Sequence, residues 1–264
     1  MIHPDNLVHP DLGLGADDDY AAAVVCFFGD IEKGVRFDPH RHRRAQLFHI
    51  VSGSLTLETA RGTFVVPPER AVWIPSEVEH AVTYLQASSL RYLFFRPDAV
   101  ARLPNEASVV RLSPLLRELT LTFMEYPRAE AADGPAKRIS DVIIDQLETV
   151  PVLPLHLPMP SSARIRRAVR ALADDPGQVA DLGALAKRAA LSERSFERHF
   201  QSETGLSFRA WRQQARLMKA VEWLSLGVPV GEISDRLGYE QPSAFVAGFR
   251  KAFGVTPAKY FSST

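Results

Sequence analysis

The sequence predicts an α+β protein in two parts, an N-terminal β-barrel followed by helices and a C-terminal all-α domain. Residues 20–96 consist of short apolar runs separated by Gly, Pro and Ser, which is typical of a small antiparallel barrel or sandwich. From Ser162 onward, apolar residues recur at helical spacing, and several aromatic and glycine positions return 49 residues later. The second part is therefore expected to contain one helical unit used twice.

The composition is that of an ordinary globular chain, and it excludes several classes of protein. The 264 residues leave room for two domains with separate cores. No run of about 18 apolar residues exists, and the first residues lack the basic and apolar stretches of a signal peptide. The single cysteine, Cys26, lies in an apolar run and is expected to be a buried small side chain without a disulfide. We therefore expect a cytoplasmic protein that does not enter a membrane.

The formal net charge of zero conceals a difference between the two halves. Residues 1–160 carry 15 Lys and Arg against 21 Asp and Glu, whereas residues 161–264 carry 16 against 10. An acidic half joined to a basic half indicates that only the C-terminal half binds a polyanion. Chance unevenness is the alternative, but the repeated helical unit lies in the basic half, which favours DNA as the polyanion.

The predicted elements follow one another in a simple order. Strands are predicted at the apolar runs Val24–Phe28, Leu47–Val51, Phe64–Val66, Ala71–Ile74, Ala81–Leu85 and Tyr92–Phe95. Helices are predicted over residues 113–125 and 134–149, and the proline-rich stretch that follows predicts an extended linker. The chain is therefore divided into a barrel (1–110), a helical segment (111–150), the linker (151–161) and an all-helical domain (162–264).

The repeat in the all-helical domain has a fixed offset. Four positions return 49 residues later: Phe196, Phe200, Gly205 and Ser207 return as Phe245, Phe249, Gly254 and Thr256. Each copy begins with a polar, helix-starting stretch and is preceded by a short amphipathic segment and a turn. The simplest structure with this pattern is a helix-turn-helix that occurs twice, which indicates binding to DNA.

The outer face of the second helix in each copy carries the predicted contacts to DNA. Phe196 and Phe200 lie about 40° apart around their helix and mark its buried side. The opposite side carries a polar triplet in each copy: Arg194, Arg198 and Gln201 in the first, and Ser243, Ala247 and Arg250 in the second. Because Arg and Gln suit guanine and adenine edges, the first helix is expected to read more of the sequence. The second is expected to make more phosphate and shape contacts.

The starts of the same helices complete this set. Ser192 is expected to cap the first helix, whose first-turn amides would then face a phosphate or a base edge. The predicted DNA-contacting residues are Ser192, Arg194, Ser195, Arg198, Gln201, Gln241, Ser243, Ala247 and Arg250.

A long helix is predicted between the two copies, over about residues 207–226. About 19 residues at 1.5 Å rise span roughly 28 Å, close to the 34 Å of one turn of B-DNA. A rod of this length would hold two reading helices in successive major grooves. The alternative is a plain helical bundle with Phe in its core, but a bundle does not explain the repeated polar face.

Residues 162–261 resemble the DNA-binding domain of the AraC/XylS family of bacterial transcription regulators. The matching motifs are Leu185-Ala186, Leu191-Ser192-Glu193-Arg194, Phe196-x-x-x-Phe200, Gly205-Leu206-Ser207, Ile233, Leu237-Gly238-Tyr239, Ser243-x-Phe245-x-x-x-Phe249-Arg250-Lys251 and Phe253-Gly254-Val255-Thr256-Pro257. The resemblance implies two helix-turn-helix units that bind promoter DNA and contact RNA polymerase. Ser234, where the family usually has Ala, and Pro242, in the first turn of a helix, depart from the pattern.

A second informative motif lies in the barrel. Gly34-x5-His40-x-His42-x3-Gln46-x6-Gly53 is followed by Pro75-x4-His80 on a later strand. Strand alternation places His40, His42 and Gln46 on one face and His49 on the other. With His80 beside them, the two inward histidines could hold a divalent metal.

This motif resembles the cupin barrel, whose metal ligands match His40, His42 and His80, and many AraC-type regulators carry a cupin-like sensor at this place. The carboxylate of the cupin pattern is replaced by Gln46, so a metal would be held only by neutral ligands. Three interpretations therefore stay open: a divalent metal on His40, His42, Gln46 and His80, a metal-free effector pocket, and a purely structural hydrogen-bonded cluster.

The inner wall of the barrel is expected to include Phe48, Ile50, Phe64 and Trp73. An apolar lining with few polar groups suits a small organic effector, although each aromatic residue taken alone is more typical of core packing than of a ligand contact. The resemblance implies that helices 113–149 pack on the barrel and form a homodimer interface, with Val142, Ile143 and Leu147 as candidates. Burial of these residues within one subunit is the alternative.

The residues together predict a dimeric, effector-responsive transcription regulator without catalytic residues. Two other functions compete with this one: a cupin-type metal-dependent enzyme fused to a DNA-binding domain, and an architectural DNA binder without sequence preference. The absence of a carboxylate at Gln46 argues against the enzyme, and the Arg-bearing face of the first reading helix argues against the architectural protein. No nucleotide-binding loop, protease triad or zinc-finger spacing occurs in the sequence.

Overall fold

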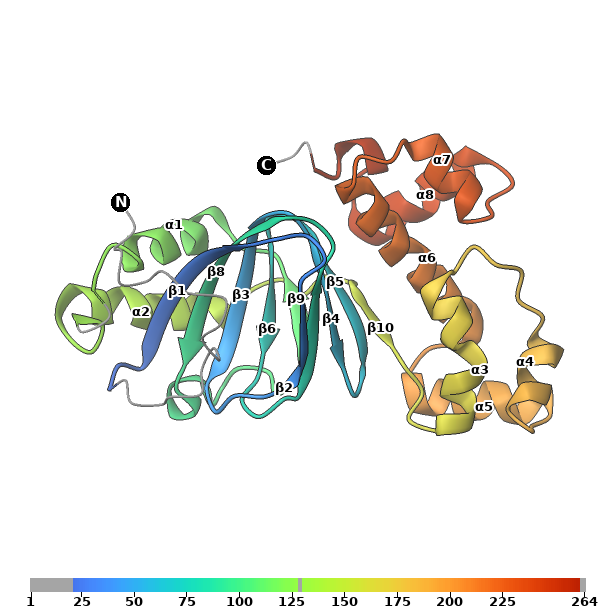
Figure 1. Ribbon diagram of the computed structural model, residues 1–264, viewed down its shortest axis with the longest axis horizontal. Helices are drawn as coiled ribbons and strands as arrows, with labels where there is room; N and C mark the ends of the chain where they lie inside the picture. Colours follow the sequence, from blue (N-terminus) through green and yellow to red (C-terminus); the bar gives the residue numbers. More distant parts are fainter. Residues whose placement is uncertain (1–20, 128–129, 262–264) are drawn as a thin grey trace. The chain divides into compact units, whose positions relative to one another are not determined.

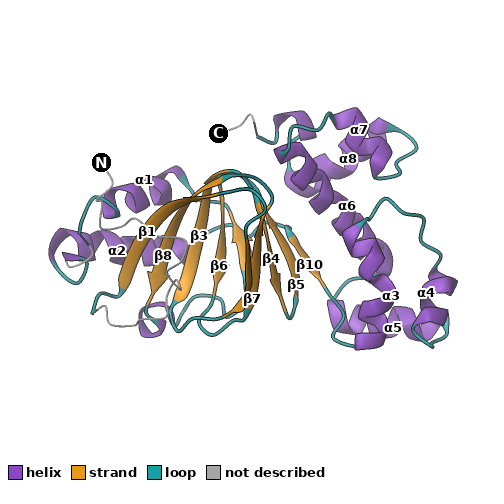
Figure 2. Cartoon of the chain, viewed as in Figure 1, coloured by secondary structure: helices purple, strands orange, loops and turns teal. Residues whose placement is uncertain are grey.

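The computed structural model describes residues 21–127 and 130–261 (Figure 1). The chain divides into two compact units, one formed by residues 1–57 and 66–153, the other by residues 58–65 and 154–264. The first unit holds most of the strands and two helices, and the second holds the remaining helices (Figure 2). The prediction about a signal peptide falls on residues 1–20, outside the described residues.

The N-terminal part contains two five-stranded sheets, in agreement with the predicted β architecture. In the first sheet the strand order is β1 (Val24–Ile31), β8 (Ser88–Phe95), β3 (Ala45–Ser52), β6 (Arg70–Ile74) and β9 (Ser108–Val110). In the second it is β10 (His156–Pro158), β5 (Gly62–Val66), β4 (Leu55–Thr59), β7 (His80–Tyr84) and β2 (Arg36–His40). The six predicted apolar runs fall on these strands, except that Leu85 lies one residue beyond the end of β7.

The central strand β3 shows how the sheets bury their cores. Phe48 lies opposite Val72 of β6 and Tyr92 of β8, so the three side chains share one face of the first sheet. The Phe48 ring also lies 6.4 Å from the ring of Tyr84, on β7 of the second sheet. This face is therefore the inner one, and the alternate positions of β3, His49 among them, belong to the outer face.

The two predicted helices are α1 (Pro114–Phe123) and α2 (Gly134–Leu147), which pack together in the first unit (Figure 1). The Ser113 hydroxyl accepts a hydrogen bond from the Leu116 amide at 3.1 Å and caps α1. Ile143 and Leu147 are both buried within the chain, whereas Val142 is 40% exposed. Of the three expected dimer contacts, Ile143 and Leu147 instead belong to the core of the subunit.

The proline-rich stretch is extended, as predicted, but it is not a free linker. Residues 156–158 form β10 and pair with β5, and the backbone continues this pairing through Val65 and Leu155. Since prolines lack an amide proton, such a stretch is tolerated as an edge strand that donates few ladder hydrogen bonds. The proline-rich stretch from Pro154 onward is therefore held by hydrogen bonds within the second compact unit.

The helices of the C-terminal part confirm two helix-turn-helix units joined by a long helix. They are α3 (Ala163–Asp174), α4 (Leu182–Arg188), α5 (Glu193–Thr204), α6 (Phe208–Ser225), α7 (Val230–Arg236) and α8 (Pro242–Phe253), with a final turn η4 (Pro257–Lys259). The units are α4 with α5 and α7 with α8, and α6 connects them (Figure 1). Its 18 residues span about 27 Å. None of the described helices combines the length and apolar character that crossing a membrane demands.

The repeat has two offsets rather than one. Before the turn the equivalent positions are 48 residues apart, as in the hydrogen bonds from Leu191 to Ala186 and from Tyr239 to Ser234. After the turn the equivalent positions are 49 residues apart. Gly205 and Gly254 are one such pair, and each ends its helix with a positive φ, of 74° and 80° respectively. The second turn is therefore one residue longer than the first.

Candidate functional site

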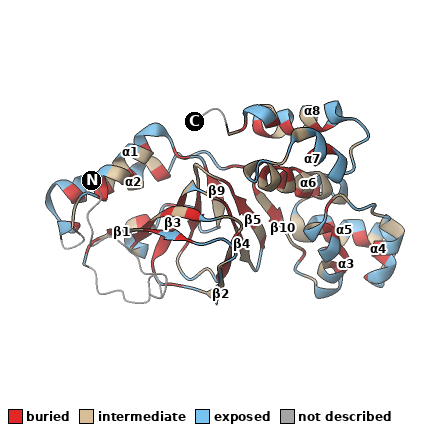
Figure 3. Cartoon of the chain, turned by 45° about the horizontal axis from the view of Figure 1, so that its top comes forward, coloured by how far each residue is buried: buried red, intermediate tan, exposed pale blue. Residues whose placement is uncertain are grey.

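The reading helix α5 has one buried side and one exposed side. Phe196 and Phe200 are fully buried and their rings stack at 5.8 Å, while Arg194, Arg198 and Gln201 are exposed. Figure 3 shows buried and exposed positions alternating along the C-terminal helices. Neither arginine makes a hydrogen bond or ion pair with any residue in the described part of the chain. Two guanidinium groups thus stand free on this surface, whereas Arg170 and Arg236 pair with carboxylates one helical turn away.

The second reading helix, α8, repeats this arrangement with shorter side chains. Phe245 and Phe249 are fully buried, and the three predicted contacts on the opposite side are exposed. A shallow depression in this surface is lined by Ser243, Val246, Ala247, Arg250, Lys251 and Thr256. Lys251 and Thr256 were not among the predicted contacts. The 49-residue repeat, in which Thr256 corresponds to Ser207, was the sequence signal that pointed to Thr256.

The two reading helices begin differently. The Ser192 hydroxyl accepts from the Ser195 amide at 3.3 Å, which confirms it as the cap of α5. Gln241 occupies the cap position of α8 without a side-chain hydrogen bond, and Pro242 follows it at the first helical position. Of these residues Ser195 is partly buried, while Ser192 and Gln241 are exposed.

The loop before α4 holds the two helix-turn-helix units together within the second compact unit. A Cβ on Gly177 would lie 2.1 Å from the carbonyl oxygen of Arg236, so the two backbones are in direct contact. Arg212 and Arg216 of α6 donate to the carbonyl oxygens of Gln178 and Pro176, at 2.7 and 3.2 Å. These contacts hold both units against the connecting helix α6.

The three predicted metal-binding imidazoles come together in the N-terminal part. The ring centroids of His40 and His80 are 4.4 Å apart, those of His42 and His80 are 5.1 Å apart, and those of His40 and His42 are 6.2 Å apart. His42 and His80 are buried, whereas His40 is partly exposed. Burial lowers the pKa of His42 and lowers that of His80 to about 4, so both rings are neutral at pH 7.

Backbone carbonyls fix the orientation of these rings. Nδ1 of each ring donates to the carbonyl oxygen of a residue two positions away: Asp38 at 2.9 Å, Arg44 at 2.5 Å and Val78 at 2.8 Å. A neutral imidazole has one N–H, so Nε2 of His42 presents a lone pair to the Gln46 side-chain amide, 3.2 Å away. The Gln46 atom at this distance is Oε1, which is itself an acceptor, so the lone pair is satisfied only by the reversed amide orientation of the same shape, with the NH₂ group toward the ring.

Imidazoles anchored in this way occur in metal sites, but the four predicted ligands, which are His40, His42, Gln46 and His80, together fit a metal ion poorly. In the part of the chain that the structure describes, no three or more His, Cys, Asp or Glu side chains are arranged to hold a metal ion. The fourth predicted ligand, Gln46, is an uncharged amide that already has His42 as a partner. A hydrogen-bonding site for a small molecule fits these neutral donors and acceptors better.

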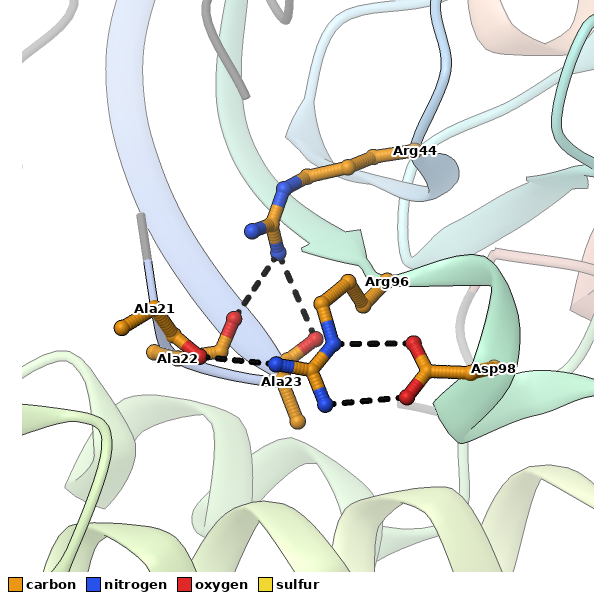
Figure 4. Close-up of polar contacts among 6 residues, drawn as sticks. All are labelled: Ala21, Ala22, Ala23, Arg44, Arg96 and Asp98. Atoms are coloured by element: carbon orange, nitrogen blue, oxygen red, sulfur yellow. Dashed lines mark hydrogen bonds and ion pairs between the residues drawn. The ribbon is translucent and has the colours of Figure 1, made fainter. Parts of the chain in front are cut away.

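Two arginines, the buried Arg44 and the partly exposed Arg96, bind the backbone just before β1 (Figure 4). Arg44 is 2% exposed, and its guanidinium donates to the carbonyl oxygens of Ala22 and Ala23 at 3.0 and 3.4 Å. Arg96 donates to Ala21 at 2.9 Å and forms a two-pronged ion pair with Asp98 (Figure 4). Arg44, whose carbonyl oxygen accepts the His42 N–H, is thus tied to the residues that precede β1. Sequence reasoning missed Arg44, because a buried arginine has no periodic signature.

The inner wall differs from the expected one. Phe48 and Ile50 share the inner face with Gln46, but Trp73 lies opposite Leu47 on the outer face, where its indole N–H donates to Pro104 at 2.8 Å. Its predicted place on the inner wall is therefore wrong, because neighbouring strand residues point to opposite faces. Phe64 stacks on the His156 ring at 4.2 Å, within the other compact unit.

Two tyrosines that the sequence analysis did not select lie on the inner wall. The Tyr84 and Tyr92 hydroxyls are 3.3 Å apart, and the Phe48 ring lies 4.6 Å from that of Tyr92. Burial raises the pKa of both tyrosines, so both stay protonated. Together with the imidazoles they give the inner face hydroxyl and ring-nitrogen groups within an aromatic lining.

Comparisons with known proteins agree with these features. A family model of the AraC-like ligand-binding domain matches residues 23–192, and one of a helix-turn-helix domain matches residues 185–263. The HTH-type transcriptional regulator NimR of Escherichia coli (strain K12) is 38% identical over 263 residues, which are 99% of this chain and 94% of that protein. The HTH-type transcriptional activator RhaR of Pectobacterium carotovorum is 37% identical over 70 residues, 26% of this chain and 25% of the relative. The solved DNA-binding domain of AdpA, in complex with a target DNA, is 30% identical and covers 39% of this chain and 93% of its own, with a TM-score of 0.36.

Proposed function

Since the chain belongs to the AraC family of transcription regulators, with an AraC-like ligand-binding domain and a DNA-binding helix-turn-helix domain, we propose that it binds promoter DNA through α5 and α8 under the control of a small effector. The observation that carries the proposal is the pair of exposed, unpaired guanidiniums of Arg194 and Arg198 on α5. Free arginines on a helix that is capped and packed from behind are the groups that read guanine in a major groove.

The two helices contribute differently in this proposal. On α5, Arg194, Arg198 and Gln201 supply long donors that reach base edges. On α8, the depression carries Arg250, Lys251 and two short hydroxyl side chains, which suit phosphate oxygens. Sequence preference therefore comes mainly from the half-site under α5, and α8 adds affinity.

The test is selection of bound fragments from a random DNA pool with the full-length protein. Arg198→Ala should flatten the base preference at one or two positions and weaken the selected site by about 10- to 100-fold. Arg170→Ala is the matched control, because Arg170 is an exposed helical arginine paired with Asp174. Equal weakening on all sequences by Arg198→Ala would instead support an architectural DNA binder.

For the effector we propose a small organic molecule that binds among the three imidazoles and the aromatic inner wall. His42, His80 and the Tyr84–Tyr92 hydroxyl pair offer both donors and acceptors beside buried rings. A few polar groups in an apolar lining are typical of small-molecule sites. Promoter binding measured with and without candidate effectors tests this; absence of any coupling would remove the sensing proposal.

A divalent metal on His40, His42, His80 and Gln46 is the alternative occupant, and it carries with it the alternative function of a metal-dependent enzyme. Metal analysis of the purified protein separates the two. Gln46→Glu supplies the missing negative charge and should increase metal retention if the imidazoles converge on an ion. Unchanged low retention in both proteins supports the metal-free effector site and a regulator without catalytic activity.

The stretch between the domains provides the proposed route of control. β10 is paired with β5, and Trp211 and Gln214 of α6 donate to the carbonyl oxygens of Pro158 and His156, the former at 2.7 Å. A change at β5 is therefore passed to the helix that carries both reading units. We further propose that the protein acts in the cytoplasm as a homodimer that contacts RNA polymerase, since family membership makes these the expected partners.

A further inference from the structure

A small cavity lies on the outer face of the first sheet, under helix α1. Its volume is about 150 Å³, and it is lined by His49 and Val51 of β3, Arg91 of β8, Glu69, and Arg117 and Leu121 of α1. All six residues belong to the first compact unit. Because His49 alternates with Phe48 along β3, the cavity is separated by the sheet from the imidazole cluster and the aromatic inner wall.

The charges around this cavity do not cancel. Arg117 forms an ion pair with Glu69 at 2.8 Å, which neutralises one positive group with the one carboxylate of the lining. Arg91 is half-buried, and it makes no hydrogen bond or ion pair with another described residue. The carboxylates of Glu69 and Asp30 act on Arg91 through electrostatic attraction without a hydrogen bond or ion pair to it. One guanidinium therefore faces the cavity without a bonded counterion.

His49 supplies a polar group of a different kind. Its side chain is 4% exposed, and neither ring nitrogen has a hydrogen-bond partner among the described residues. Burial, reinforced by Arg91 and Arg117, lowers the pKa of His49 to about 3, so the ring is neutral at pH 7. A neutral imidazole offers one N–H, and buried donors of this kind are nearly always satisfied in folded proteins. The cavity thus presents a free cation and a free N–H donor together.

We propose that this cavity binds a small monovalent anion of the short-chain carboxylate class. The carboxylate takes a paired hydrogen bond from Arg91 and accepts the N–H of His49, and its hydrocarbon part lies against Val51 and Leu121. The size agrees with this class, because a water occupies about 30 Å³ in the liquid, and the space equals only about five waters. The proposal goes beyond the function of the imidazole cluster and does not depend on it.

The cavity lies between helix α1 and the first sheet, so a molecule bound in it would contact both. Arg117 and Leu121 lie on α1, whereas His49, Val51 and Arg91 lie on the sheet. A bound carboxylate therefore bridges helix and sheet and raises the stability of the first unit by RT ln(1 + L/Kd), where L is the free carboxylate concentration. Ligand binding at this place is measurable even in the absence of DNA.

The experiment is a calorimetric titration of the full-length protein with propionate at constant ionic strength, with chloride and neutral propionamide as comparison titrants. Propionate should bind, and chloride and propionamide should bind at least about tenfold more weakly, because only the carboxylate offers a charged pair of acceptors. Arg91→Gln should reduce propionate affinity at least about tenfold. Arg102→Gln, a change at a largely exposed arginine of the same unit, should leave it unchanged.

Two further variants protect the test from a folding artefact and from confusion with the inner site. Leu121→Phe keeps the charges and fills the cavity, so it should abolish propionate binding in a folded protein. His42→Gln alters the imidazole cluster and should leave propionate binding as it is. Propionate binding that survives both Arg91→Gln and Leu121→Phe, or that is lost with His42→Gln, overturns the proposal. Neither result bears on whether α5 and α8 bind DNA.

Discussion

Gly177 and Arg236 meet through their backbones, since a Cβ on the glycine would lie 2.1 Å from the arginine carbonyl oxygen. Gly177 precedes the first helix-turn-helix and Arg236 ends the first helix of the second. This single contact, with the arginines of α6 beside it, joins two units that the sequence shows only as separate copies. A methyl group added at this glycine would meet the backbone of the second helix-turn-helix.

Gly177→Ala should therefore lower stability and impair DNA binding. The added methyl group meets backbone rather than a flexible side chain, and overpacking of this kind costs about 1–3 kcal/mol. Urea denaturation and binding to a selected DNA site measure the two effects. Gly231→Ala is the matched control, because a Cβ there meets nothing within 4 Å in helix α7. It should be neutral or stabilising by up to about 1 kcal/mol. Equal behaviour of the two variants would contradict the contact.

Ser234→Ala should stabilise the second helix-turn-helix. The Ser234 side chain is fully buried, and its hydroxyl has no hydrogen-bond partner among the described residues. Removing an unsatisfied buried hydroxyl should raise the free energy of unfolding by about 1 kcal/mol. The equivalent position in the first unit is Ala186, also buried, so Ala186→Ser should destabilise by a similar amount. Denaturation curves of the two variants should move in opposite directions.

Ser192→Ala should destabilise α5, whereas Gln241→Ala should leave α8 nearly unchanged. The Ser192 hydroxyl accepts from the Ser195 amide, and loss of such a cap costs about 1 kcal/mol. Gln241 makes no capping hydrogen bond with its side chain. Thermal melting of both variants provides the measurement, and a larger loss from Gln241→Ala than from Ser192→Ala would show that the caps are wrongly assigned.

His49 should make stability depend on pH below neutrality. Its native pKa is lowered to about 3 by burial and by Arg91 and Arg117, while the unfolded chain titrates near 6.5. As the pH falls below about 6.5, the unfolded state binds a proton that the native state excludes. Stability is therefore full above pH 6.5 and is lost toward pH 3, by up to about 1.4 kcal/mol per pH unit.

The measurement is urea denaturation of the protein and of His49→Phe between pH 7.5 and 4.5 in buffers free of carboxylates. The difference in unfolding free energy between the two proteins should change with pH in the direction given above. Parallel pH profiles would mean that His49 titrates normally in the native state.

The sequence predicted the faces of the helices well, and it failed where strands choose their partners. Phe196 and Phe200 are buried and Arg194 and Arg198 exposed because a helix fixes these relations within a few residues. Trp73 was misplaced because a one-residue error in strand alternation moves a side chain to the opposite face. The extra residue in the second turn was missed because the matched aromatic positions lie on only one side of it.

The amino-acid order by itself determined the doubled helix-turn-helix, the polar faces of its helices α5 and α8 and the grouping of His40 with His42, whereas the pairing of β2 with β7 brings His80 to them. The faces and the grouping follow from spacing along one helix or strand, because the backbone geometry of that element fixes the side on which each side chain lies. Tertiary structure alone decided that the proline-rich stretch pairs with β5, that Gly177 packs on Arg236, and that His49 and Arg91 share a cavity under α1. Each of these contacts joins segments that are far apart in the chain. Such contacts depend on which surfaces pack against each other, and local periodicity carries no information about that packing.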